Sequence, residues 1–146
     1  MHIDDDRYAV VEDDENSPLI HIWVVGEPTE PAFMQYQDDL LAAFRRQPGR
    51  FAVIGDQGRL QFFPLRLVAV SVRWIKEAKR EFGSRWVCAS FVLNSPLLRR
   101  VMSAMVWASG DAISMAAFGT HEEAEAWSRE QLAAAESSGA EAGEAR

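Results

Sequence analysis

The feature that most constrains the fold of this 146-residue chain is the alternation of short apolar runs with longer amphipathic segments. Two β-rich runs, 7–12 and 19–25, are joined by an acidic, Asn/Ser/Pro-containing link, which predicts a hairpin. Further strands are expected at 51–56, 85–93 and 112–118, each separated from the next by a helical pattern. Strands that alternate with helices need right-handed crossovers. The sequence therefore predicts an α/β fold of order ββαβαβαβα, a mostly parallel five-stranded sheet with an N-terminal antiparallel hairpin and four helices.

Capping residues and apolar stripes predict where the four helices begin and end. The first follows an N-cap at Thr29 and stops before Pro48, and the second runs from Pro64 to Phe82 with Gly83 as its C-cap. The third opens at 94–96 and ends near 109–111, and the fourth begins with a capping box at 120–123. We expect Trp127 to anchor this last helix on the sheet. Residues 1–135 then form one domain, and the Ala/Gly/Ser/Glu-rich segment 136–146 is expected to be a disordered tail.

Composition places the chain among ordinary globular proteins. Its single cysteine, Cys88, excludes an internal disulfide framework and fits a reducing compartment. The N-terminus is acidic and has no apolar core of a signal peptide, and the longest apolar runs are about five residues, far below the ~20 of a membrane span. We expect a soluble, cytoplasmic protein.

The charge is strongly polarised along the chain. Residues 45–100 hold 12 of the 15 Lys and Arg but only three acids, a balance of +9, whereas the whole chain carries −7. The acidic total argues against nucleic acid as a partner. The basic block is explained either by a solvated face or by a surface that binds an acidic partner.

Catalytic and metal-binding patterns are not visible in the sequence. The loop after the third strand, 56–61, has no Ser, Thr, Cys or His, so it offers neither a nucleophile nor a phospho-acceptor. His2, His21 and His121 are too scattered to predict a metal site. Cys88 is expected to be a buried, inert thiol. We therefore expect no enzyme activity, no metal and no cofactor.

A binding surface is expected around the second and third helices. More large apolar side chains lie there than one packing seam needs, so they either complete the core or line a groove rimmed by arginines. They are Phe62, Phe63, Leu65, Leu97, Leu98, Met102, Met105 and Trp107. Loops that leave the carboxyl ends of strands are the usual ligand-binding positions. The candidate binding residues are Asp56, Arg59, Phe62, Phe63, Arg66, Arg73, Arg99 and Arg100.

Two segments carry a resemblance to a known family: Asn94-Ser95-Pro96-Leu97-Leu98-Arg99 and Phe118-Gly119-Thr120-His121-Glu122-Glu123-Ala124-Glu125-Ala126-Trp127. With the predicted element order, residues 7–134 resemble the SpoIIAA-like branch of the STAS (sulphate transporter and anti-sigma factor antagonist) superfamily. The resemblance implies a non-enzymatic regulatory module that docks a protein partner. It also implies a phosphorylatable Ser or Thr where the second helix begins, but this chain has Gln57 to Gln61 and then Phe62-Phe63-Pro64 there.

The expected function is therefore a protein-interaction module, without the usual phospho-acceptor, that uses the second and third helices. The alternative is binding of a lipid or another anionic amphiphile, or peripheral membrane association, through the same surface. The sequence leaves the oligomeric state open, a homodimer included.

Overall fold

A computed structural model describes residues 7–57, 63–110 and 113–144, with side chains described as far as Ser138. It confirms the predicted α/β fold: a five-stranded sheet in the order β1-β2-β3-β4-β5, in which only the β1–β2 pair is antiparallel. The strands are β1 (Ala9–Glu12), β2 (Leu19–Val24), β3 (Phe51–Asp56), β4 (Trp86–Val92) and β5 (Ser114–Phe118). The α-helices are α1 (Glu30–Arg46), α2 (Leu65–Phe82), α3 (Pro96–Ser109) and α4 (His121–Glu144), and a short 3-10 turn, Gly83–Arg85, precedes β4.

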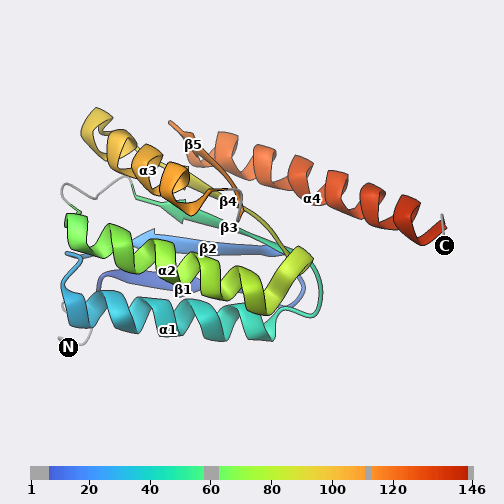
Figure 1. Ribbon diagram of the computed structural model, residues 1–146, viewed down its shortest axis with the longest axis horizontal. Coiled ribbons are helices and arrows are strands. Elements are labelled where there is room, and N and C mark those ends of the chain that lie inside the picture. The colour runs from blue at the N-terminus through green and yellow to red at the C-terminus, as the bar shows by residue number, and fades with distance from the viewer. Residues whose placement is uncertain (1–6, 58–62, 111–112, 145–146) are drawn as a thin grey trace.

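Three helices cover one face of the sheet and the fourth covers the other (Figure 1). Each parallel strand lies beside the strand that precedes it in the chain, so every right-handed crossover steps in the same direction and places its helix on the same face. These crossover helices are α1, α2 and α3. The helix α4 follows the last strand and packs on the opposite face, mainly against β4 and β3.

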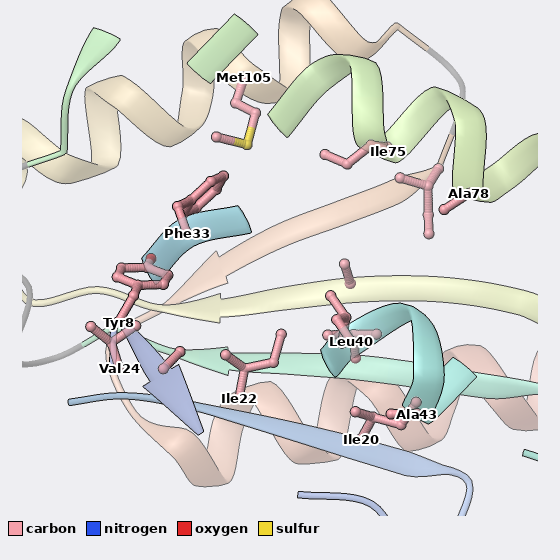
Figure 2. Packing of buried hydrophobic residues seen from close by; sticks show 14 of the residues in the cluster. Tyr8, Ile20, Ile22, Val24, Phe33, Leu40, Ala43, Ile75, Ala78 and Met105 are labelled. Atoms are coloured by element: carbon pink, nitrogen blue, oxygen red, sulfur yellow. The ribbon is translucent and has the colours of Figure 1, made fainter. Parts of the chain in front are cut away.

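The larger core lies between the sheet and α1, α2 and α3. Figure 2 shows its layers, with Phe33 and Leu40 of α1 and Ile75 of α2 above Ile20 and Ile22 of β2. A smaller core under α4 joins Ile54, Cys88 and Val92 to Ala124 and Leu132. The two faces of β2 are covered unequally: Ile20 and Ile22 are buried under the crossover helices, whereas His21 and Trp23 on the α4 side are partly exposed.

The helix termini follow the predicted capping chemistry. The hydroxyl oxygens of Thr29 and Ser95 each accept a hydrogen bond from the backbone N–H three residues on, both at 3.4 Å. Thr120 accepts one from Glu123 N–H at 3.2 Å and donates its hydroxyl to Glu123 Oε1 at 2.9 Å. Gly83 ends α2 with φ +57°, a value that suits glycine.

The C-terminal region differs from the expectation in two respects. The predicted end of the last helix near residue 135 is too early, because α4 continues to Glu144, through most of the segment 136–146 that was expected to be disordered. Five of the nine residues 136–144 are Ala or Glu, strong helix formers that favour this extension, although Gly139, Gly143 and the lack of apolar burial oppose it. In addition, Trp127 is only partly buried and packs at 5.7 Å against Phe118, while the contact face of α4 is built from smaller residues at a spacing of four, Ala124, Ser128 and Leu132. Among the described residues, no helix is both long and apolar enough to cross a membrane.

Candidate functional site

A groove of about 590 Å³ runs along the outer side of α2 and has the end of α3 as part of its wall. Its apolar lining comes from Leu65, Val68, Ala69 and Val72 of α2 and from Ala108 of α3. Of these α2 residues Leu65 and Ala69 are exposed, whereas Val68 and Val72 are half-buried and pack against the larger core, which Leu67 and Ile75 enter fully. The groove therefore lies along the border between the buried face of α2 and its exposed side.

Cations line the same groove. Arg73, Lys76 and Arg80 belong to its lining, together with a single acid, Glu77. All four side chains are exposed. Because steps of three and four residues return to one side of a helix, the three cations form a row beside the apolar lining. The predicted candidate Arg66 lies seven residues before Arg73 and is also exposed, at the start of α2.

The third helix adds large exposed apolar groups to this region. Leu97 is 65% exposed and Trp107, next to groove-lining Ala108, is 85% exposed, while Leu65 of α2 is 78% exposed. The candidates Arg99 and Arg100 are exposed on α3 but do not belong to the groove lining. Leu97 and Trp107 do not belong to the groove lining, so Leu65 is the large exposed apolar residue of the groove itself. Single exposed apolar residues are common, but an apolar groove beside a row of cations is typical of a surface that binds a partner.

The remaining candidates lie elsewhere. Phe63 is buried in the larger core, where its ring packs edge-on against Phe33 at 5.6 Å. Asp56 ends β3 on the α4 side of the sheet, with Oδ2 3.4 Å from Nδ1 of His121. Arg59 and Phe62 lie outside the described residues. The structure thus separates Asp56 and Phe63 from the groove that Arg73 lines.

The larger core holds a cavity of about 70 Å³ between the sheet and the helices α1, α2 and α3. Its lining extends along β4 from Trp86, at the start of the strand, to Phe91 near its end, and includes Met115 near the start of β5. Burial raises the pKa of the lining phenols Tyr8 and Tyr36, so both stay neutral. Within the part of the chain that the structure describes, Trp86 Nε1 is buried with no hydrogen-bond partner. The mostly apolar lining thus includes two phenols, the polar side chains of Gln37, Gln57 and Ser71, and two groups unsatisfied among the described residues, the Trp86 indole N–H and Gln57 Oε1.

A cluster that the sequence did not predict lies where β2 meets the start of α4. The rings of His21, Trp23 and His121 stack nearly parallel, with centroids 4.8 Å apart for Trp23–His121 and 5.2 Å apart for the two imidazoles. Burial, and secondarily the neighbouring His121, lowers the pKa of His21. Asp56 is close enough to His121 for an electrostatic contact, but the geometry is not that of a hydrogen bond. The cluster helps to hold the first turn of α4 on the sheet.

The described part of the chain offers little support for a metal site or for a reactive cysteine. No group of three or more His, Cys, Asp or Glu side chains in residues 7–57, 63–110 and 113–144 could hold a metal ion. Cys88 is fully buried, and burial raises the pKa of its thiol to about 11, so the reactive thiolate is disfavoured.

No protein-family model, curated protein or solved structure matches this chain.

Proposed function

We propose that this chain is a non-enzymatic regulatory module, similar to SpoIIAA-like STAS proteins, that docks a protein partner through the outer surface of α2 and α3. The observation that carries the proposal is the apolar lining on the solvent side of α2. Leu65 and Ala69 are exposed, and Val68 and Val72 are only half-buried against the protein's own core, so part of their apolar surface stays open to solvent. Apolar surface that the fold does not cover, bounded by charge, marks interaction sites.

The start of α2 supports docking without a phosphorylation switch. The segment from Gln57 to Pro64 contains no hydroxyl residue. The nearest one on α2, Ser71, is buried and donates its hydroxyl to the Leu67 carbonyl oxygen at 2.8 Å. A kinase would have to unfold the helix to reach it. The single buried cysteine, Cys88, fits the reducing conditions of the cytoplasm, where we place the protein as part of this proposal.

The test is a pull-down with the double variant Arg66→Glu/Arg73→Glu. Both side chains are exposed and on one side of α2, so we expect unchanged folding and weaker recovery of the partner, most of all at low salt. The control carries the same change in net charge on α4, by Glu substitution of the exposed residues Ala133, Ala134, Ser137 and Ser138. Equal recovery with both variants and the unmodified protein would contradict the proposal.

The alternative, binding of a lipid or another anionic amphiphile, is favoured by the cavity beneath α2 and α3. Its volume of about 70 Å³ equals that of only about two water molecules in the liquid, so an acyl chain would have to displace side chains. Met102, Met105 and Met115 line it, and methionine adapts readily to new shapes. Native mass spectrometry distinguishes protein docking from lipid binding, since a lipid-sized adduct on the purified protein supports the alternative.

A further inference from the structure

The shape of the α2–α3 groove restricts what can occupy it. The lining extends from Leu65 to Arg80, roughly 22 Å along the axis at ~1.5 Å per residue. Both walls are helices, whose backbone groups are already paired internally, so an extended peptide would find no strand edge to join. A helix satisfies its own backbone and can lie along α2 at the usual interaxial distance of about 8–10 Å.

The chemistry of the groove restricts the occupant further. Leu65, Ala69 and Val72 recur at steps of four and three along its apolar lining, a spacing that another helix meets with apolar residues at the same steps. Arg73 and Arg80 are seven residues apart, about 10 Å along the axis, with Lys76 between them. Acids spaced by three, four or seven residues on the occupant would face these cations, and only Glu77 would oppose them.

We propose that the groove binds an acidic amphipathic helix of a partner protein, lying along α2 with its apolar stripe against the groove lining and its carboxylates facing the row of cations. The inference rests on the proposed docking function and specifies the partner's chemistry. It favours a helix over a lipid bilayer, because a concave, elongated site fits a rod better than a flat surface.

The test uses a fluorescein-labelled synthetic peptide of about 18 residues, enough to fill the groove as a helix. It carries Leu at helical spacing, Glu along one adjoining edge and Ala elsewhere. We expect saturable binding by fluorescence anisotropy. A permuted peptide of equal composition, with no apolar face, should not bind.

Charge exchange makes the test specific. The variant Arg73→Glu/Arg80→Glu should weaken binding of the acidic peptide by at least about tenfold. The same variant should gain affinity for a peptide with Lys in place of Glu, whereas the α4 control variant with four added glutamates should not. Equal binding of the acidic peptide by both variants would overturn the inference.

Two further outcomes distinguish failure of the acidic-helix inference from failure of the proposed docking function. If Arg66→Glu/Arg73→Glu abolishes partner recovery while the acidic peptide fails to bind, docking stands and the acidic helix is wrong. If the unmodified protein instead sediments with phosphatidylglycerol–phosphatidylcholine vesicles and ignores the peptide, both the acidic helix and protein docking at this surface are wrong.

Discussion

Replacing Phe44 by Ala should remove the centre of the aromatic cluster between α1 and the sheet. The Phe44 side chain is fully buried, and its ring centroid lies 4.5 Å from Phe51, 4.9 Å from Trp86, 5.3 Å from Phe82 and 5.6 Å from Trp74. Truncating a buried Phe to Ala costs about 3–5 kcal/mol, and oriented aromatic pairs add to simple burial. With four such pairs we expect about 4–5 kcal/mol, a large part of the roughly 5–15 kcal/mol that stabilises a domain.

Urea unfolding followed by far-ultraviolet circular dichroism measures this loss as a lower midpoint. Should the Ala variant fail to fold, Phe44→Leu keeps the test measurable, with an expected loss of about 1.5 kcal/mol. Trp107→Ala is the matched control, because that indole is 85% exposed and its removal should change stability by no more than about 0.5 kcal/mol. A loss for Trp107→Ala as large as that for Phe44→Ala would refute the assignment of the core and of the outer face of α3.

Two further predictions concern pH and a helix end. The folded-state pKa of His21 is lowered below its ordinary value of 6.5, so the unfolded chain binds protons more readily than the folded protein. The urea midpoint should therefore decrease as the pH is lowered from about 7.5 to about 5.5, and it should decrease less in His21→Gln. A midpoint that increases on acidification would contradict the stacking of His21 against His121. Gly83→Ala should cost about 1–3 kcal/mol in the same assay, because φ +57° with ψ −133° is a conformation that only glycine adopts readily; no loss would mean that α2 ends differently.

Local patterns were sufficient to predict the order and type of the elements. Thr29, Ser95 and Gly83 mark helix ends through chemistry that involves only neighbouring residues, which is why the sequence locates them well. The end of α4 was misplaced because the expectation weighed apolar burial, whereas alanine and glutamate continue a helix through propensity alone.

The candidate site was harder to predict because it depends on distances between elements. Phe63 and Leu65 are two residues apart and both apolar, yet one is buried in the core and the other is exposed at the groove. Which of them faces inward follows from how α2 lies on the sheet, a tertiary property. The stack of His21 and His121 likewise joins residues 100 positions apart that only the sheet order brings together.

The position of Cys88 under α4 gives the protein a built-in reporter of local opening. Its thiol is fully buried in the smaller core, where α4 packs against β4. Reagents can reach this sulfur when α4 lifts from the sheet, even if the larger core under α1, α2 and α3 stays intact. Because Cys88 is the single cysteine of the chain, the labelling rate of the unmodified protein reports the free energy of that opening without any engineered probe. A labelling rate faster than global unfolding would identify α4 as a separately opening unit.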